Sequence, residues 1–176
     1  HKKGDRILSN LDIVVRESDR LSRLINDFLD LSRIESGHME WNDSPVNIPQ
    51  VMQQAVESVM GERQNNRDVV LNIDIQADIP PIVVDRDRIQ QVFINLLHNA
   101  VKFTHQGEIG IEARYSGKRL LIKVWDTGVG IPAGQTELIF QKFHQFEQDG
   151  KPKGTGLGLP ITKQIVEQYG GNIHVE

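Results

Sequence analysis

The sequence predicts an α+β fold, a two-layer α/β sandwich preceded by one long helix. Apolar residues recur at helical spacing over about residues 5–36. After Trp41 the composition changes, and helix-like segments are interspersed with short alternating segments that are typical of strands. Two expected strands, near residues 108–115 and 119–125, are joined by Ser116-Gly117-Lys118, which favours antiparallel pairing. Helices mixed with antiparallel strands indicate the α+β class.

Composition restricts the kinds of protein that this chain can be. It has 176 residues, a net charge of −4 and no cysteine. A reducing compartment is therefore expected, and disulfides and thiolate metal sites are excluded. The basic surplus typical of nucleic-acid binding is missing, so no nucleic-acid partner is expected. No apolar run approaches the roughly 18 residues that a membrane span needs.

The first expected helix carries a broad apolar stripe and ends near Gly37. The stripe consists of Ile7, Leu11, Val14, Leu21, Ile25 and Phe28, widened by Leu24, Leu31 and Ile34. Its width suits a helical bundle better than a narrow two-helix seam. Packing of this helix on its own domain remains the alternative.

The remaining helices and strands are predicted from helix-capping residues, from prolines that end or begin elements, and from alternating apolar residues. We expect a helix capped by Asn47 that runs to about Arg63, and a second capped by Asp85 that runs through Phe103. Further strands are expected at residues 69–75, 82–84 and from 172 to 176, and a last helix at 159–169 with Pro160 in its first turn. Residues 127–158 are rich in glycine and turn formers and show little regular pattern.

The helix that follows Asp85 carries the first candidate site. Its expected apolar stripe consists of Ile89, Phe93, Leu96, Ala100 and Phe103, and its opposite side of Gln91, Asn95, Asn99 and Lys102. A solvated face is the simple interpretation, but asparagine is a poor helix former. An asparagine oxygen suits Mg²⁺, and a lysine in the last turn can reach the phosphates of a nucleotide.

Two glycine-rich segments complete the candidate site. Asp126-Thr127-Gly128-Val129-Gly130 follows an expected strand, and its carboxylate can accept a hydrogen bond from an exocyclic amine such as that of adenine. Gly154-Thr155-Gly156-Leu157-Gly158-Leu159 opens a helix, where backbone amides bind anions. Each motif alone is equally compatible with an ordinary turn. The aromatic segment 140–146 and the charged residues up to 153 are expected to form a lid, and a surface loop held by core phenylalanines is the alternative.

Taken in order, these motifs resemble those of bacterial sensor histidine kinases over about residues 40–176. Residues 95–104 are similar to the family's N box, 126–130 to its G1 box, 140–146 to its F box and 154–159 to its G2 box. The first helix resembles the second helix of the family's dimerisation domain. The resemblance implies a Bergerat-type ATP-binding domain at 39–176, with its last strand truncated, after a dimerisation helix at 1–38.

The resemblance also implies cofactors and residue roles. ATP and Mg²⁺ are the implied cofactors, with Asn99 as the metal ligand and Asn95 and Lys102 as catalytic residues. Asp126 would bind the adenine amine. The other implied ATP-binding residues are Phe103, Gly128, Gly130, Gly154, Thr155, Gly156, Leu157 and Gly158. Some F boxes in the family carry an arginine that contacts phosphates; this sequence has none there, and Lys142, Lys151 and Lys153 remain alternatives.

The implied partners are a second copy, through the N-terminal helix, and the receiver domain of a response regulator. A cytoplasmic location is expected, either free or as the cytoplasmic part of a membrane-anchored sensor. None of the six histidines lies in the family's phosphoacceptor motif, so no phosphoacceptor is assigned and the first bundle helix is expected to be missing.

Two other functions remain open at this stage. An ATP-driven clamp like those of gyrase, Hsp90 and MutL has a water-activating glutamate one turn before the metal asparagine, and here that position is Asn95. An amide cannot act as a base, which favours a histidine acceptor. A nucleotide-binding or dimerisation module without catalysis is the second alternative.

Overall fold

The computed structural model describes residues 2–61, 68–132, 134–145 and 154–176 of the chain. Two compact units are present, one made of residues 1–39 and 138–164 and the other of residues 40–137 and 165–176. The division into a dimerisation helix at residues 1–38 and an ATP-binding domain at residues 39–176 stays a prediction.

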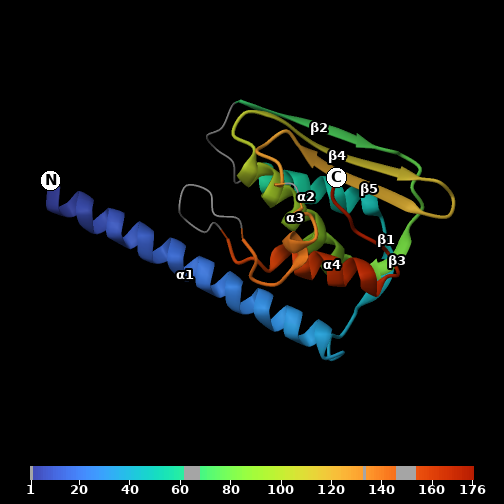
Figure 1. The fold of residues 1–176 in the computed structure, drawn as a ribbon, viewed down its shortest axis with the longest axis horizontal. Helices are drawn as coiled ribbons and strands as arrows, with labels where there is room; N and C mark the ends of the chain where they lie inside the picture. The colour runs from blue at the N-terminus through green and yellow to red at the C-terminus, as the bar shows by residue number, and fades with distance from the viewer. Residues whose placement is uncertain (1, 62–67, 133, 146–153) are drawn as a thin grey trace. The chain divides into compact units, whose positions relative to one another are not determined.

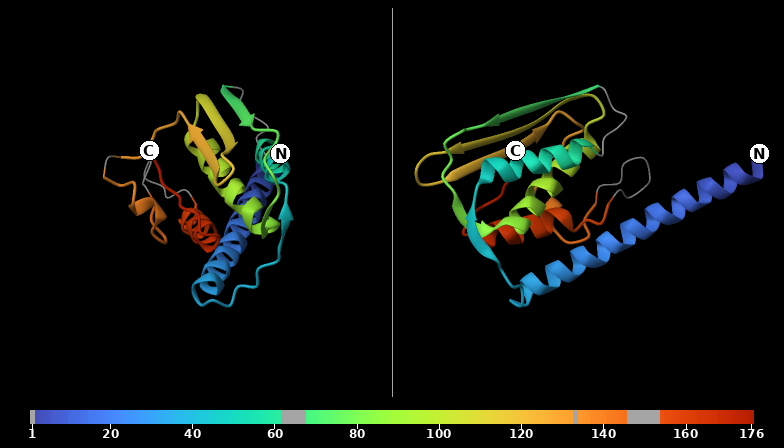
Figure 2. Two further views of the ribbon diagram at one scale, coloured as in Figure 1. Left: turned by 90° about the vertical axis from the view of Figure 1, so that its right-hand side faces the viewer. Right: turned by 180° about the vertical axis from the view of Figure 1, so that it is seen from behind.

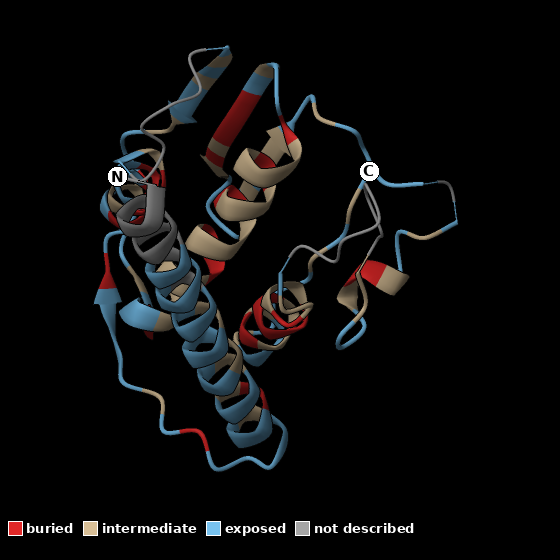
Figure 3. Cartoon of the chain, turned by 90° about the vertical axis from the view of Figure 1, so that its left-hand side faces the viewer, coloured by how far each residue is buried: buried red, intermediate tan, exposed pale blue. Residues whose placement is uncertain are grey.

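The first unit begins with helix α1 (Lys2–Glu35), as the apolar stripe predicts (Figure 1). Gly37 ends it with a φ of 70°, and the amides of Gly37 and His38 donate to the carbonyls of Ile34 and Arg33. Most of α1 is exposed, as Figure 3 shows. The exposed apolar residues include Leu11, Val14, Leu21, Ile25 and Phe28. This unit also contains the short 3₁₀ helix η1 (Leu138–Phe140) and the start of helix α4 (Gly158–Gln168).

The second unit contains two small sheets and the helices that cover them (Figures 1 and 2). Strands β1 (Asp43–Val46) and β3 (Ile82–Asp85) form an antiparallel pair. Strands β2 (Val69–Ile75), β4 (Gly107–Tyr115) and β5 (Leu120–Asp126) form a three-stranded sheet in the order β2-β4-β5. Helices α2 (Ile48–Gly61) and α3 (Arg86–Phe103) pack together on one face of this sheet.

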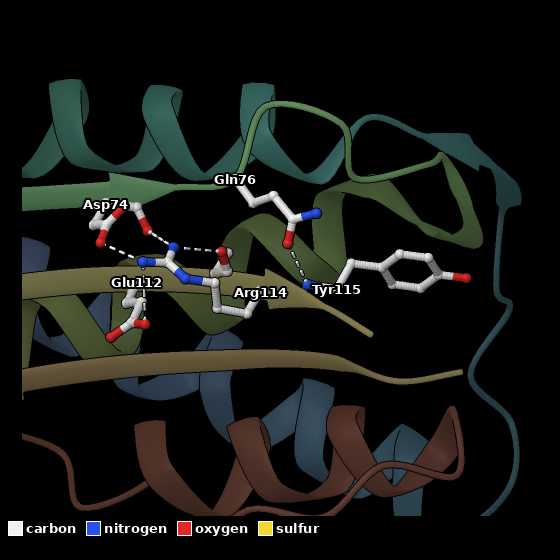
Figure 4. Close-up of polar contacts among 6 residues, drawn as sticks. Asp74, Gln76, Glu112, Arg114 and Tyr115 are labelled. Atoms are coloured by element: carbon white, nitrogen blue, oxygen red, sulfur yellow. Dashed lines mark hydrogen bonds and ion pairs between the residues drawn. The ribbon is translucent and has the colours of Figure 1, made fainter. Parts of the chain in front are cut away.

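Alternation along β4 separates the two faces of the larger sheet. Ile109, Ile111 and Ala113 are buried, and the intervening Glu112 and Arg114 lie on the other face. Arg114 binds the carboxylate of Asp74 on β2 and donates to its carbonyl at 2.9 Å (Figure 4). The hydrogen bond from Arg114 lowers the pKa of Asp74. These contacts join the parallel strands β2 and β4 at their exposed face.

Asp85 fixes the beginning of α3. Its Oδ1 accepts from the amides of Asp87 and Arg88 at 3.0 and 3.1 Å, which confirms the predicted N-cap. Its Oδ2 accepts from the amide of Asn42 at 3.0 Å. The same carboxylate therefore joins the start of α3 to the segment that precedes β1.

Tyr169 makes a second connection to the same segment. Its hydroxyl accepts from the amide of Asp85 at 2.8 Å and donates to Asp43 at 2.7 Å. Its ring lies edge-on to Trp41 with centroids 5.6 Å apart. Burial, followed by the hydrogen bond to Asp43, raises the pKa of Tyr169 to about 12. The residues after α4 are thus tied to the segment that enters β1.

Several predicted details are wrong. Residues 172–176 do not form a strand, because alternation alone cannot make one without a hydrogen-bonded neighbour. Strand β1 was not predicted, and the sequence does not specify the partner of β2, which pairs with β4 in parallel. On α3 the deeply buried residues are Val92, Phe93, Leu97 and Ala100, and the expected Ile89, Leu96 and Phe103 are only half-buried. The other helix and strand positions agree with the predictions to within about three residues.

Within the described residues, no helix is long and apolar enough to cross a membrane. Parts of the expected lid, including Phe146, Lys151 and Lys153, lie outside the described residues.

Candidate functional site

The polar side of α3 is not an ordinary solvated face. Asn95, Asn99 and Lys102 are all half-buried, as is Gln91 at the beginning of the same row. Arg88 donates to the Gln91 side chain at 3.0 Å, so the row continues a polar network from the first turn of the helix. Amide side chains held at partly shielded positions can offer oxygens to a cation or a phosphate-bound ligand.

The last turn of α3 places Lys102 beside an aromatic ring. Its Nζ lies 4.5 Å from the centroid of the Phe103 ring, within the range of a cation–π contact. Both side chains are half-buried. The contact positions the basic residue of the last turn of this helix. The ammonium group of Lys102 thus lies against the ring of the next residue.

The first glycine loop, residues 126–130, directly follows β5 and is attached to the end of α3. Asp126 Oδ1 accepts from the Gly128 amide at 2.8 Å and from the Thr104 hydroxyl at 3.2 Å. The Val129 amide donates to the Phe103 carbonyl at 3.4 Å. The loop and the end of the helix thus form one hydrogen-bonded arrangement around an exposed carboxylate.

Gly128 is required where the loop passes the helix. A Cβ at this position would lie 2.3 Å from the carbonyl oxygen of Phe103 and 2.7 Å from Asp126 Oδ1. Both distances are shorter than real Cβ contacts, and the nearer atom belongs to the backbone, so the loop would have to move. The glycine predicted to shape the site therefore acts by allowing close approach of two backbones.

The second glycine loop, residues 154–159, belongs to the first unit and opens α4. The Leu157 amide donates to the Thr155 hydroxyl at 3.3 Å, and the Phe143 amide donates to the Gly156 carbonyl at 3.0 Å. Leu157 is fully buried, and Gly156 has a φ of 72°. The loop is thus anchored by Leu157 and packed against the backbone of Phe143.

Side chains of α1 contact this second loop. The Thr155 hydroxyl donates to Asp27 at 3.2 Å, and Arg20 donates to the Gly154 carbonyl at 3.5 Å. Burial raises the pKa of Asp27 above its ordinary value, with the Thr155 hydrogen bond acting in the opposite direction. Two residues of the predicted ATP-binding set therefore interact with the helix that precedes the domain.

The F-box segment also contacts α1. Lys142 Nζ lies 2.6 Å from a carboxylate oxygen of Glu35, and both side chains are about half exposed. A pocket of about 420 Å³ beside this ion pair is lined by residues of α1 and of the F-box segment. The lining residues are Phe28, Leu31, Ser32, Glu35, Ser36, Lys142 and Phe143. Lys142 is thus engaged with α1, and Lys151 and Lys153 lie outside the described residues.

The structure brings some predicted site residues together within each unit. Asn95, Asn99, Lys102 and Phe103 lie on α3, and its C-terminal end contacts the first glycine loop. Gly130, in that loop, has a φ of 70°, and nothing lies within 4 Å of a Cβ built at this position. Gly154, Thr155, Gly156, Leu157 and Gly158 lie together in the other unit. Each set is a separate local arrangement.

Sequence reasoning missed Thr104 and Asp27. Thr104 is fully buried at the C-cap of α3, and its partner Asp126 lies 22 residues further along the chain. Asp27 contacts Thr155 across 128 residues. Periodicity cannot reveal such pairs.

No cluster of three or more histidine, cysteine, aspartate or glutamate side chains suited to a metal occurs among the residues that the structure describes.

Comparison with known families assigns both parts of the chain. Residues 84–176 match the family described as histidine kinase-, DNA gyrase B- and HSP90-like ATPase. Residues 3–37 match the His Kinase A (phospho-acceptor) domain. The two matches cover the α3-to-α4 region and nearly all of α1.

Individual relatives agree with these matches. The circadian input-output histidine kinase CikA of Synechococcus elongatus is 38% identical over 163 residues, which are 90% of this chain and 22% of the relative. The sensor protein KdpD of Escherichia coli is 36% identical over 153 residues, 86% of this chain and 17% of the relative. This chain therefore spans about a fifth of the length of these curated relatives.

A solved structure of another protein has a similar fold. Full-length ShkA in complex with AMPPNP matches with a TM-score of 0.79 and 29% identity, over 96% of this chain and 35% of ShkA. The mixed helix-and-strand arrangement and the preceding long helix are thus shared with a protein whose structure contains a nucleotide analogue.

Proposed function

This chain belongs to the histidine kinase-, DNA gyrase B- and HSP90-like ATPase family, and we propose that it is the part of a sensor histidine kinase that binds Mg–ATP. In the whole protein, the γ-phosphate would pass to a histidine and then to an aspartate of a response-regulator receiver domain. The observation that carries the proposal is Asp126, held at the end of β5 by the end of α3. The name of the CikA relative, a histidine kinase, supports the kinase class.

The first part of the proposed site is the base pocket. Asp126 Oδ1 is engaged by Thr104 and Gly128, so Oδ2 is the oxygen that would accept the adenine amine. Gly128 and Gly130 let the chain pass closely beside the base. The half-buried ring of Phe103, at the end of α3, would contribute apolar surface to the same pocket.

Two sets of residues are proposed to bind phosphate groups. On α3, Lys102 supplies a positive charge, and Asn95 is the amide one turn before Asn99 on the same side of the helix. In the second glycine loop, backbone amides precede and open α4, where these donors and the helix dipole favour an anion. The loop residues concerned are Gly154, Thr155, Gly156, Leu157 and Gly158.

Mg²⁺ fits the available donors. The metal prefers oxygen ligands, and it usually keeps several water ligands and is coordinated by the phosphates of the substrate. Asn99 offers one amide oxygen from a half-buried position, and among the described residues no cluster of carboxylates forms an all-protein site. When bound, the ion would neutralise phosphate charge, and Asn99 would orient it.

The acceptor histidine is proposed to lie outside this chain. Residues 2–37 contain no histidine, although residues 3–37 match the phospho-acceptor domain. His98 is half-buried and directly precedes Asn99, so its side chain points about 100° away from it around the helix. Phosphate transfer requires a histidine nitrogen within roughly 3–3.5 Å of the γ-phosphorus of ATP. Neither α1 nor His98 offers a nitrogen with such a placement.

The exposed apolar stripe of α1 supports a homodimer of the whole protein. Leu11, Val14, Leu21, Ile25 and Phe28 are each about half exposed and recur at heptad-like spacing. Such a face needs a helical partner to be removed from water. We infer that a second copy supplies it and that the assembled bundle presents the phosphohistidine to the receiver domain. We place this assembly in the cytoplasm, either free or attached to a membrane-anchored sensor.

A titration with ATP tests the nucleotide proposal. Calorimetry with and without Mg²⁺ is expected to show tighter binding with the metal, and Asn99→Ala is expected to remove that difference because the amide oxygen is lost. Gln53→Ala, at an exposed position of α2, serves as the matched deletion of a side-chain amide. Equal affinity of wild type and Asn99→Ala in Mg²⁺ would remove Asn99 from the metal site.

A labelling assay tests the kinase proposal. With γ-labelled ATP, this chain alone is expected to remain unlabelled, whereas a supplied acceptor helix should gain acid-labile, alkali-stable label. Phosphate release without any acceptor would favour an ATP-driven clamp. Tight Mg–ATP binding with neither reaction would favour a non-catalytic nucleotide-binding module.

A further inference from the structure

Thr104 is one of the few polar side chains that are buried among the described residues, and its surroundings are unusually specific. The others are Asp85, which caps α3, and Thr162 in α4. Thr104 is fully buried, so water cannot satisfy its hydroxyl. Its hydrogen-bond partner is the carboxylate of Asp126, which is exposed. A buried residue thus acts directly on the exposed group of the proposed base pocket.

The backbone holds Thr104 in place independently of its side chain. It is the C-cap of α3, with φ −106° and ψ 107°, and its amide donates to the Ala100 carbonyl at 3.1 Å. The preceding carbonyl, that of Phe103, accepts from the Val129 amide. The hydroxyl is therefore presented from a fixed point to the loop that carries Asp126.

Two donors on one oxygen determine how the carboxylate is turned. The terminal torsion of an aspartate is otherwise broad, so a single contact would leave its orientation loosely defined. Here the Thr104 hydroxyl at 3.2 Å and the Gly128 amide at 2.8 Å both donate to Oδ1. The direction of Oδ2 follows from this arrangement, since the two oxygens share one plane.

We propose that Thr104 is a positioning residue for base selection: its buried hydroxyl turns Asp126 so that Oδ2 accepts the exocyclic amine of adenine. A guanine base presents a carbonyl oxygen at the corresponding position, and two acceptors facing each other repel. A correctly turned carboxylate therefore favours ATP over GTP. This inference rests on the proposed function, because it assumes that Asp126 faces the base.

Thr104→Val is the sharpest change, because it keeps the shape of the side chain and removes only the hydroxyl. Affinities for Mg–ATP and Mg–GTP would be measured by displacement of a fluorescent ATP analogue. Loss of a hydrogen bond to a charged group predicts about a tenfold loss of ATP affinity, with little change for GTP. Thr104→Ser keeps the donor and should retain the wild-type ratio of ATP to GTP affinity.

Thr162→Val is the matched control, because it makes the same chemical change at another fully buried threonine. It should leave the ATP-to-GTP ratio unchanged even if it lowers the melting temperature. Thr104→Ala replaces the valine variant if valine prevents folding, as judged by circular dichroism.

Three outcomes are distinct. A ratio that falls in Thr104→Val and is kept in Thr104→Ser supports the inference. An unchanged ratio in a folded Thr104→Val protein, or equal losses for ATP and GTP, overturns the inference while the proposed function stands. A wild-type chain that binds neither nucleotide overturns the proposed function and this inference with it.

Discussion

The two glycine loops of this chain are fixed in different ways. The first loop is tied to the end of α3 by a backbone hydrogen bond to Phe103 and by the buried hydroxyl of Thr104. The second loop is anchored by the buried Leu157, and its polar groups contact the α1 side chains Asp27 and Arg20. One loop thus depends on contacts within its own fold, and the other also depends on the preceding helix.

This difference has an energetic consequence. Leaving the fully buried Thr104 hydroxyl without a partner is expensive, whereas the hydrogen bond from Arg20 to the Gly154 carbonyl is exposed and contributes little. The first loop should therefore be preformed, which would lower the entropic cost of binding a ligand there. The second loop can give up its exposed hydrogen bond with Arg20 at little cost when it binds the proposed nucleotide.

Gly128→Ala should give the largest effect, because it breaks the first loop at its closest approach to α3. The new Cβ would lie 2.3 Å from the Phe103 carbonyl oxygen, so the two backbones must separate. Overpacking of this kind costs about 1–3 kcal/mol, which corresponds to a fall in melting temperature of roughly 3–10 °C. ATP affinity should fall with it. Thermal unfolding and ATP titration of the same variant would measure both.

Gly61→Ala is the control for that substitution, because nothing lies within 4 Å of a Cβ built at Gly61. It should leave ATP affinity unchanged and should not lower the melting temperature. Wild-type stability and affinity in Gly128→Ala would show that the loop is not held against α3.

Tyr169→Phe should have an intermediate effect, because it removes one part-buried and one exposed hydrogen bond from the second unit. The change removes the acceptor for the Asp85 amide and the donor to Asp43, and keeps the ring beside Trp41. A loss of about 1–2 kcal/mol in unfolding free energy is expected. Tyr115→Phe, which removes a hydroxyl that donates to the Gly117 carbonyl in an exposed hydrogen bond, should cost less.

The pH dependence provides a second measurement on the same variant. The folded-state pKa of Tyr169 is raised from 10.0 to about 12, so the neutral form is favoured in the folded protein. Its contribution is complete below pH 10 and is lost as the pH rises towards about 12. Urea unfolding between about pH 9 and 12 should show a steeper decline for wild type than for Tyr169→Phe. Parallel curves would contradict the assigned contacts.

Asp27→Asn should give the smallest effect, because it alters only the attachment of the second loop to α1. Burial raises the pKa of Asp27, so the folded state disfavours its charge. Stability should therefore decline as the pH rises from the ordinary value of 3.8 through the folded-state pKa. Asparagine removes the charge and keeps an oxygen for the Thr155 hydroxyl. A gain of roughly a few tenths of a kcal/mol at about pH 7 and none at about pH 3 is expected, since the site is half exposed.

Asp19→Asn, at an exposed position of α1, is the matched control and should change stability little at either pH. A loss of stability in Asp27→Asn at neutral pH would show that the charged carboxylate, and not merely its oxygen, holds Thr155.

The elements that the sequence predicted correctly have strong local signals. Helix α3 follows from the Asp85 cap and its apolar stripe, and β2 from four alternating apolar residues. Strand β1 has one buried residue in four and contains Pro45, so alternation could not reveal it. Residues 172–176 alternate without forming a strand, because pairing depends on a neighbour that periodicity does not specify.

In the candidate site, too, local sequence signals do not specify contacts between distant segments. The glycine motifs and the asparagines of α3 could be found from residue type and order, because their chemistry is local. The attachments of Asp126 to Thr104 and of Thr155 to Asp27 join distant segments, and only the folded chain brings them together. The roles assigned to Asn95, Asn99 and Lys102 stay predictions until nucleotide binding is measured.

Amide hydrogen exchange with and without Mg–ATP tests the difference between the two loops most directly. The amides of Thr127 and Val129 are bonded to the carbonyls of Glu108 and Phe103, so exchange in the first loop should already be slow without nucleotide. Residues 154–159 should exchange faster at first and slow markedly when Mg–ATP is added. If the first loop instead exchanges as fast as the second without nucleotide, or if Mg–ATP slows neither, the account is contradicted.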